Sequence, residues 1–327
     1  MKISDCRLAI VGATGLVGEY LLKVLESRGL RPKQLALFAS QRSAGKKITF
    51  ADKEYAVSAL KRDNIGDYDA AIFAAGGKIS KDFAPVFAEK GCIVIDKSSA
   101  WRDDRDCPLV IPQINSDALV NIPKKIVASP NCSTTGLILA LKPLIDAFGV
   151  PEHIVVATYQ SVSGAGRAAS DALERQRGGF TAPEPFAEMI FDNLIPAIGK
   201  IDGDGFFTEE TKLIHESRKI LNIKDLMISA TAVRVPVEIG HSEAVTIFWN
   251  REIPVNKAIE ALCEAPLMEL KDIPTPRKAA GLESVAVGRI RKTPGKPGVL
   301  NLFLSFDNLL RGAASNAIDI LEALPKD

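Results

Sequence analysis

The sequence is poor in the residues that build metal and disulfide sites. It has three histidines, His153, His215 and His241, with no HxxxH or HxH spacing, so a metal site is not expected. Its five cysteines are odd in number and include no CxxC pair. This pattern argues against a zinc ribbon or a disulfide framework and fits a reducing compartment.

An excess of charge and a long apolar run are also missing. The 41 Lys and Arg residues nearly balance 40 Asp and Glu residues, giving a net charge of +1. Bulk charge therefore does not favour a nucleic-acid or membrane partner. The polar start MKISD is unlike a signal peptide, and no apolar run approaches the ~20 residues needed to span a bilayer. We expect a cytoplasmic protein.

Strand-like and helix-like segments alternate over the first 130 residues. The expected strands are Arg7–Val11, Leu35–Ser40, Asp69–Ala75 and Cys92–Asp96, and the expected helices are Leu16–Ser27 and Ser80–Lys90. Such alternation predicts a parallel sheet with helices on both faces. We therefore expect an α/β protein with an N-terminal Rossmann-like dinucleotide-binding domain.

The pattern changes after an expected helix at Thr134–Phe148. Longer strands follow at His153–Ser161, Met227–Val237, Glu243–Trp249, Glu283–Arg291 and Val299–Phe306. A helix is expected at Gly164–Thr181, an irregular segment at Ala182–Gly205 and a terminal helix at Leu309–Leu324. Several strands alternate as in a one-sided sheet, which predicts an α+β second domain with a mixed sheet.

Three glycines follow the first strand, at Gly12, Gly15 and Gly18. Glycines at a strand-to-helix turn let the backbone approach a pyrophosphate that rests on the helix N-terminus. The candidate cofactor-binding residues of this turn are Gly12, Thr14, Gly15, Leu16 and Val17. The spacing is GxxGxxG rather than GxGxxG, so a structural turn is the alternative.

The end of the second strand bears on which dinucleotide binds. An NAD site usually carries an acid there, whereas this chain has Ser40, Arg42 and Ser43 and no acid up to Lys46. A guanidinium forks onto phosphate oxygens and would suit a 2′-phosphate. The pattern favours NADP, with a solvated basic loop as the alternative.

Cys132 lies where a polar turn meets an apolar helix. The N-terminal end of a helix stabilises a thiolate, although most free cysteines are packing residues. His241, which follows Gly240 between two strands, is the best proton-transfer partner, with a structural histidine as the alternative. An imidazole there could deprotonate the thiol and later return the proton.

Buried-looking charges indicate a substrate site. Arg234 extends a strand face of small apolar residues, so it needs either a substrate carboxylate or an internal acid. Glu216 interrupts the apolar stripe of its helix, and Lys219 follows three residues later, although an intrahelical ion pair would explain both. Arg102 follows the fourth strand at the ligand-binding edge of the sheet, where it could share a phosphate with Lys219.

Taken together and in order, the segments resemble aspartate-semialdehyde dehydrogenases over essentially the whole chain. The segments are GATGLVG, ASQRSAGK, AAGG, IDKSSAWR, SPNCSTT, TYQSVSGAGRAA, HESRKIL, VRVPVEIGHSEAV, GRIRK and DNLLRGAASNA. The resemblance implies NADPH-dependent reduction of L-aspartyl 4-phosphate to L-aspartate 4-semialdehyde, a step in lysine, threonine and methionine biosynthesis. It also implies domains at 1–130 plus 308–327 and at 131–307, and a homodimer, with pairing into tetramers left open.

The resemblance further implies a role for each site residue. The assignments are Cys132 as thioacyl nucleophile, His241 as acid/base, Gln160 and Asn131 as orienting residues, Arg234 and Glu216 at the aspartyl carboxylate and amine, Arg102, Lys219 and Asn131 at the phosphate, and Ser163, Gly164 and Asn308 near the nicotinamide. No metal is implied.

Three positions depart from the family pattern. Gly136 stands where glutamine is frequent, Lys97 where asparagine is frequent, and Lys78 where a small hydroxyl residue is frequent. A reductase of another acyl phosphate or acyl thioester is therefore the first alternative. A catalytically silent dimeric paralogue is the second, although its expected mark, loss of Cys132 or His241, is absent.

Overall fold

The computed structural model describes residues 2–325, so Met1, Lys326 and Asp327, which the predicted first domain includes, lie outside the described residues. The chain divides into two compact units. The first contains residues 1–131 and 313–327, and the second contains residues 132–312. The boundaries that we expected from the sequence were 130/131 and 307/308.

The first unit is built on a seven-stranded sheet in the order β3-β4-β2-β1-β5-β6-β7. Its strands are β1 (Arg7–Val11), β2 (Gln34–Ala39), β3 (Lys47–Phe50), β4 (Lys53–Ala59), β5 (Ala70–Phe73), β6 (Ile93–Asp96) and β7 (Ile126–Ala128). All pairs are parallel except β3 with β4. The chain runs outward from β1 in one direction and then returns to β5 on its other side, so a topological switch point lies between β1 and β5.

Helices cover both faces of this sheet because right-handed crossovers that run in opposite directions across the sheet place their helices on opposite faces. They are α1 (Leu16–Ser27), α2 (Gly77–Glu89), α3 (Pro112–Asn115) and α9 (Ser315–Ala323), with 3₁₀ turns at Ile3–Asp5, Gln41–Ser43, Arg62–Asn64 and Ser116–Val120. One face has an aromatic core in which Phe87 of α2 packs edge-on against Phe73 of β5 and Phe38 of β2.

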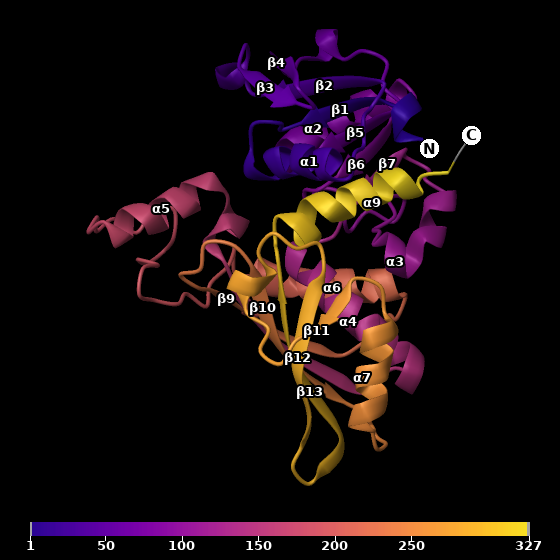
Figure 1. The fold of residues 1–327 in the computed structure, drawn as a ribbon, viewed down its shortest axis with the longest axis vertical. Coiled ribbons are helices and arrows are strands. Elements are labelled where there is room, and N and C mark those ends of the chain that lie inside the picture. The colour runs from indigo at the N-terminus through magenta and orange to yellow at the C-terminus, as the bar shows by residue number, and fades with distance from the viewer. Residues whose placement is uncertain (1, 326–327) are drawn as a thin grey trace. The chain divides into compact units, whose positions relative to one another are not determined.

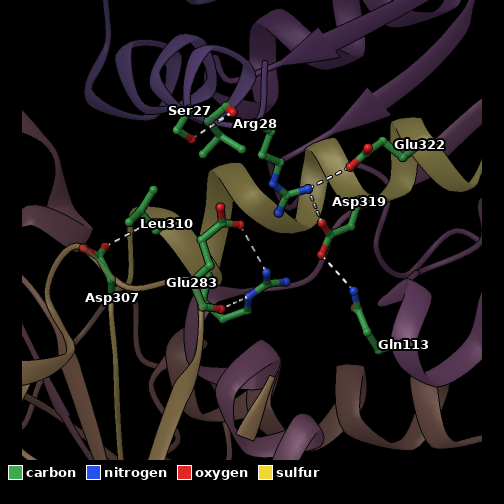
Figure 2. A network of polar contacts seen from close by, with 10 residues as sticks. Ser27, Arg28, Gln113, Glu283, Asp307, Leu310, Asp319 and Glu322 are labelled. Atoms are coloured by element: carbon green, nitrogen blue, oxygen red, sulfur yellow. Dashed lines mark hydrogen bonds and ion pairs between the residues drawn. The ribbon is translucent and has the colours of Figure 1, made fainter. Parts of the chain in front are cut away.

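The last helix, α9, belongs to the first unit although the chain has by then passed through the second. Arg28 at the end of α1 donates from Nη1 to Asp319 and Glu322 over 2.8 and 2.7 Å (Figure 2). Gln113 of α3 donates to the other oxygen of Asp319 over 2.9 Å. These ties, together with the apolar face of α9, hold the helix against α1 and α3.

The second unit contains a six-stranded mixed sheet in the order β11-β12-β13-β10-β8-β9 (Figure 1). Its strands are β8 (His153–Gln160), β9 (Ile228–Arg234), β10 (His241–Phe248), β11 (Met268–Leu270), β12 (Val285–Thr293) and β13 (Lys296–Phe306). The outer pairs β11/β12 and β8/β9 are parallel, and the central pairs are antiparallel. The mixed sheet expected from the sequence is confirmed.

One face of this sheet is covered by helices, and the other is open. The helices of the unit are α4 (Cys132–Phe148), α5 (Arg167–Arg177), α6 (Thr208–Leu221), α7 (Val255–Glu264) and α8 (Pro276–Ala279), with a 3₁₀ turn at Val162–Ala165; a π-helical turn at Leu310–Ala314 leads into α9. The helix α4 packs against α6, α7, β10, β12 and β13. Inward residues such as Ile154 and Leu304 are fully buried, whereas Val155 and Tyr159 on the opposite face are each 38% exposed.

Candidate active site

The glycine turn after β1 has the tight geometry that a dinucleotide site needs. Gly12 has a φ of 91°, and a Cβ there would lie 2.8 Å from the carbonyl carbon of Ala74, just beyond β5. A Cβ on Gly18 would lie 2.3 Å from Gly12 O, so α1 packs directly on the turn. Side chains at these positions would clash with the backbone, so the glycines let the turn pack tightly at the switch point and at the N-terminus of α1. The turn therefore fits a pyrophosphate.

The ribose end of the expected cofactor site lies at the carboxyl end of β2. Thr14 Oγ1 donates to Ser43 Oγ over 3.3 Å, which links the glycine turn to the 3₁₀ turn that carries Arg42. Ser40 and Arg42 are exposed. Arg42 is therefore available to a phosphate on the adenosine ribose.

Cys132 is the first residue of α4 and is partly exposed. Its position at the helix N-terminus, expected from the sequence, places the thiol at the positive end of the helix dipole. A Cβ at Gly312 would lie 2.6 Å from Cys132 Cβ. Only glycine lets the π-helical turn pass this close to Cys132. Sequence reasoning missed Gly312, because nothing local marks it.

Three predicted residues form a row along one edge of the second sheet. The β8/β9 register places Gln160 beside Arg234, and the β10/β8 register, which pairs Ser242 with Tyr159, places His241 next to Gln160. Gln160 is buried, and its Nε2 donates to Thr158 Oγ1 over 3.2 Å. The edge therefore carries an amide, a guanidinium and an imidazole side by side.

The charged and titratable ends of this row converge on Gly164. A Cβ at Gly164 would lie 3.1 Å from both Arg234 Nη1 and His241 Nε2. Arg234 Nη1 also donates to Ser161 O over 2.7 Å. A side chain at position 164 would fill the space that these two groups face, so glycine keeps that space open for a ligand.

The electrostatics of the site centre on Arg234. Burial is the main cause that lowers its pKa, and the charges of Glu209 and Cys132 oppose this effect. The pKa of His241 is lowered to about 3, first by burial and then by Arg234, so the imidazole is neutral. Arg234 thus interacts with both proposed catalytic groups, and its positive charge favours the Cys132 thiolate.

Glu209 is a charged residue of this site that sequence reasoning missed. It lies in the first turn of α6, is 7% exposed, and forms an ion pair with Lys212 at 2.8 Å. Its charge acts on both Arg234 and His241. Glu210, the adjacent acid, has a structural role, because its carboxylate accepts from the backbone N–H groups of Phe207 and Ala232. Nothing in the sequence indicates which of these two acids acts on the charges of the site.

Glu216 lies on the buried stripe of α6, as expected, and is 2% exposed. The helix packs against both α4 and β9, the elements that carry Cys132 and Arg234. Lys219, one turn later, is partly exposed. Their proposed contacts with the aspartyl amine and the phosphate stay predictions.

Arg102 and Asn131 belong to the first unit. Arg102 Nε donates to Ser129 O over 3.0 Å, and its Nη2 donates to Lys97 O over 2.7 Å. Lys97 Nζ donates to Ser129 Oγ and Pro130 O over 3.0 and 3.2 Å. Lys97, one of the departures from the family pattern, therefore holds the turn that leads to Asn131. Lys78, another departure, is exposed at the start of α2.

The third departure, Gly136, has a steric cause. A Cβ at Gly136 would lie 2.2 Å from Cε1 of Phe306 at the end of β13. The Phe306 ring lies edge-on to His241, with ring centroids 6.0 Å apart. Phe306 thus packs between the backbone of α4 and the imidazole, and glycine is required to admit it.

Asn308 and Ser163, which the resemblance assigned to the nicotinamide, lie beside His241. Asn308 Oδ1 accepts from Ser161 Oγ over 3.0 Å and from the backbone N–H of Gly240 over 2.8 Å. Asn308 Nδ2 donates to Ser163 Oγ over 3.1 Å. Their contacts with a cofactor stay predictions.

No cluster of metal-ligating side chains occurs among residues 2–325, and no helix in that range is long and apolar enough to cross a bilayer. A cavity of about 770 Å³ lies in the first unit and is lined by residues including Arg7, Asp69 and Ile93. These residues mark the amino ends of the strands. Ligands of open α/β sheets bind at the opposite edge, so we do not assign the cofactor to this cavity.

Comparison with known proteins places the chain in a family. The family described as "Semialdehyde dehydrogenase, NAD binding domain" matches residues 7–122, and "Semialdehyde dehydrogenase, dimerisation domain" matches residues 141–311. An aspartate-semialdehyde dehydrogenase of Aquifex aeolicus is 43% identical, with 98% of each chain covered. The crystal structure of aspartate semialdehyde dehydrogenase II from Vibrio cholerae is 40% identical, covers 98% of each chain and has a TM-score of 0.94.

A Candida albicans aspartate semialdehyde dehydrogenase, solved with NADP, is 26% identical and has a TM-score of 0.77, again with 98% of each chain covered. Identity and coverage of this extent leave no large segment of the chain unmatched. Together with the glycine turn and the Cys132–Arg234–His241 arrangement, they show that the chain belongs to the aspartate-semialdehyde dehydrogenase family.

Proposed function

We propose that this protein catalyses the NADPH-dependent reduction of L-aspartyl 4-phosphate to L-aspartate 4-semialdehyde and phosphate. The observation that carries the proposal is the position of Cys132 at the N-terminus of α4, with Arg234 interacting with both its thiolate and His241. The relatives bear the matching name, and one Vibrio cholerae structure with a TM-score of 0.94 is described as complexed with ASA.

The chemistry begins with the Cys132 thiolate, which attacks C4 of the acyl phosphate. The C–O bond to phosphate breaks, inorganic phosphate leaves with the electron pair, and a thioester remains on Cys132. When bound, NADPH supplies the hydride that reduces this thioester to the level of the aldehyde. The C–S bond then breaks, which releases the semialdehyde and restores the thiolate, and His241 assists as the acid/base.

The substrate groups have candidate partners of complementary charge. Arg234 is proposed to bind the α-carboxylate and Glu216 the amine, because one is a buried cation and the other a buried acid. Gln160 orients the substrate from its place beside Arg234. Arg102, Lys219 and Asn131 are proposed to hold the phosphate, each as a hydrogen-bond donor.

NADP is proposed over NAD. The glycine turn fits either dinucleotide, since both contain the pyrophosphate. The distinction lies at the carboxyl end of β2, where Arg42 and the hydroxyls of Ser40 and Ser43 replace the acid that would bind a ribose 2′-hydroxyl. A guanidinium there favours the 2′-phosphate of NADP.

The active form is proposed to be a homodimer in the cytoplasm. The dimerisation-domain family covers most of the second unit. The open face of its sheet displays Val155, Tyr159 and Phe303, with the last two rings stacked at 6.1 Å. A second copy would cover this apolar face, as large obligate interfaces do.

The test is the reverse reaction, followed by NADPH absorbance with L-aspartate 4-semialdehyde, phosphate and NADP. We expect activity in the wild type, loss of at least ~10³-fold in Cys132→Ser because a hydroxyl is a far weaker nucleophile, and a preference for NADP over NAD that Arg42→Ala abolishes. An inactive wild type, or an active Cys132→Ser variant, would refute the proposal. Activity with coenzyme A in place of phosphate would instead support the thioester alternative.

A further inference from the structure

Lys97 has no role in the proposed reaction, although it is half-buried and directly follows β6. Its backbone N–H donates to Phe73 O over 2.9 Å, which anchors the residue at the carboxyl end of the sheet. Its ammonium donates to Ser129 Oγ over 3.0 Å and to Pro130 O over 3.2 Å. The side chain therefore connects the end of β6 with the turn that follows β7.

Ser129 is held in place without Lys97. Its N–H donates to Asp96 O over 2.8 Å, and its carbonyl accepts from Arg102 Nε over 3.0 Å. Its hydroxyl oxygen also accepts from Asn316 Nδ2 over 2.8 Å. These three hydrogen bonds would keep Ser129 in position if the ammonium of Lys97 were removed.

Pro130 depends on Lys97 to a greater degree. A proline has no N–H, so its carbonyl is the one backbone group through which it can form a hydrogen bond. Pro130 is buried, and among residues 2–325 its carbonyl oxygen accepts only from Lys97 Nζ. Without the ammonium this buried carbonyl would lack a donor, which is unfavourable, so we expect it to turn toward another one.

The direction of this carbonyl determines the direction of the next N–H. The peptide bond between Pro130 and Asn131 is trans. Because a peptide group is planar, the C=O of Pro130 and the N–H of Asn131 lie in one plane and point in opposite directions. Lys97 therefore fixes the plane of the peptide that leads into Asn131, one of the proposed phosphate ligands.

Lys97 also connects Asn131 with a second proposed phosphate ligand, Arg102. The backbone carbonyl of Lys97 accepts from Arg102 Nη2 over 2.7 Å. The guanidinium is thus anchored by the main chain of the same residue whose side chain holds the Pro130 carbonyl. A substitution at position 97 removes the side-chain contact and retains the main-chain contact.

We propose that Lys97 is a positioning residue of the phosphate site, whose ammonium holds the Pro130 carbonyl so that Asn131 faces the phosphate beside Arg102. The role rests on the proposed function, in which Asn131 and Arg102 bind the phosphate. Lys97 acts through the turn, by donating a hydrogen bond. Its effect should therefore fall on phosphate binding, and a neutral donor at position 97 should replace most of it.

Crystal structures of ligand-free protein test the contact without any reaction. Lys97→Met removes the ammonium, and we expect the Pro130–Asn131 peptide to rotate out of its wild-type plane. Lys97→Gln has a side chain as long as that of methionine but retains an N–H donor, so the peptide should stay in place. A wild-type plane in Lys97→Met, for example with a water molecule in place of the ammonium, would overturn the proposal.

Kinetics of the reverse reaction test the positioning role. For Lys97→Met we expect the KM for phosphate to rise about tenfold, the size expected for the loss of one charge-assisted hydrogen bond. The KM for L-aspartate 4-semialdehyde should change little, and Lys97→Gln should recover most of the loss. Equal rises of both KM values in Lys97→Met would indicate a general disturbance of the fold and refute the role.

Salt separates positioning from simple attraction between charges. A defect that arises only from the lost charge would be the same in Lys97→Gln and Lys97→Met and would vanish near ~1 M KCl, where charges are screened. A positioning defect should persist in Lys97→Met at that salt concentration. The first result would refute the proposal.

The matched control is Lys78→Met, which removes an exposed lysine of the first unit that also departs from the family pattern. It should leave both KM values and the Pro130–Asn131 peptide unchanged. Should Lys97→Met fold poorly, Lys97→Asn, with the shorter residue that is frequent in the family, replaces it. An inactive wild type whose variants show the expected peptide positions would refute only the proposed function, whereas an unchanged KM for phosphate in active Lys97→Met would refute only the positioning role.

Discussion

At the scale of single residues, the site combines groups that the sequence marks with groups that it does not. Cys132 and His241 carry local signals, a helix start and a glycine turn, so their positions could be predicted, while their catalytic roles stay predictions. Glu209, Ser161 and Gly312 carry none, because their roles come from distant segments that folding brings to Arg234, His241 and Cys132. The spacing of residues along the chain does not indicate which distant segments come into contact.

Replacing Arg234 should make the thiolate form of Cys132 less favourable. In a Cys263→Ser background, which removes the exposed cysteine, Arg234→Met should raise the pKa of Cys132 because a neighbouring cation is lost. The measurement is the rate of iodoacetamide alkylation against pH. Arg234→Lys, which retains the charge, should shift the profile less. An unchanged profile in Arg234→Met would show that the guanidinium does not support the thiolate.

At the scale of elements, the strongest patterns predicted the correct segments. The helix at Leu16–Ser27 and the strand at Arg7–Val11 were predicted with their observed bounds. The β3/β4 hairpin was missed, because its turn uses Ala51 and Asp52 at φ values of 51° and 62° in place of the usual Asn-Gly. The predicted helix from Gly164 begins only at Arg167, because Gly166 has a φ of 92°.

The packing of α4 on β13 depends on Gly136. Gly136→Ala would normally favour a helix, but here its Cβ would meet the Phe306 ring at 2.2 Å, and we expect a loss of about 1–3 kcal/mol in unfolding free energy. Urea denaturation measures the change. Gly203→Ala, which meets nothing within 4 Å, is the control. The double variant Gly136→Ala/Phe306→Leu should recover part of the loss, and equal stability of Gly136→Ala and wild type would contradict the steric account.

At the scale of the whole molecule, the glycine turn lies in the first unit, and Cys132 and His241 lie in the second. The sequence predicted both architectures because helix–strand alternation and long alternating strands are each visible in the pattern. It could not predict that the fold buries an ionisable acid at the expense of unfolding free energy. Glu243, on the inner face of β10, is fully buried with neither carboxyl oxygen hydrogen-bonded among residues 2–325, and burial raises its pKa well above the usual value.

Glu243 should therefore make stability fall as pH rises. Above about pH 4.5 the unfolded chain loses this proton while the native state retains it, so unfolding free energy drops by about 1.4 kcal/mol per pH unit up to the raised native pKa. We expect the stability advantage of Glu243→Gln over wild type to widen from pH 5 to pH 8 in urea denaturation at fixed protein concentration.

Below pH 6.5 the unfolded chain gains a proton on His241 that the native state does not bind, so this residue lowers the unfolding free energy as pH falls. His241 is present in both wild type and Glu243→Gln, so its contribution cancels in the difference between them. Glu252→Gln, which changes an exposed carboxylate paired with Lys292, is the control and should show no such widening. A constant or shrinking difference for Glu243→Gln would mean that this carboxyl ionises in the native state.

The central claim is that Cys132 forms a thioester with the aspartyl group, and mass spectrometry tests it most directly. Wild-type protein is mixed with L-aspartyl 4-phosphate without NADPH, quenched in acid and digested. The account predicts one aspartyl group on the peptide that contains Cys132, released by hydroxylamine and absent from Cys132→Ala. An unmodified Cys132 in protein that turns over the same substrate with NADPH, or an aspartyl group on another residue, would contradict it.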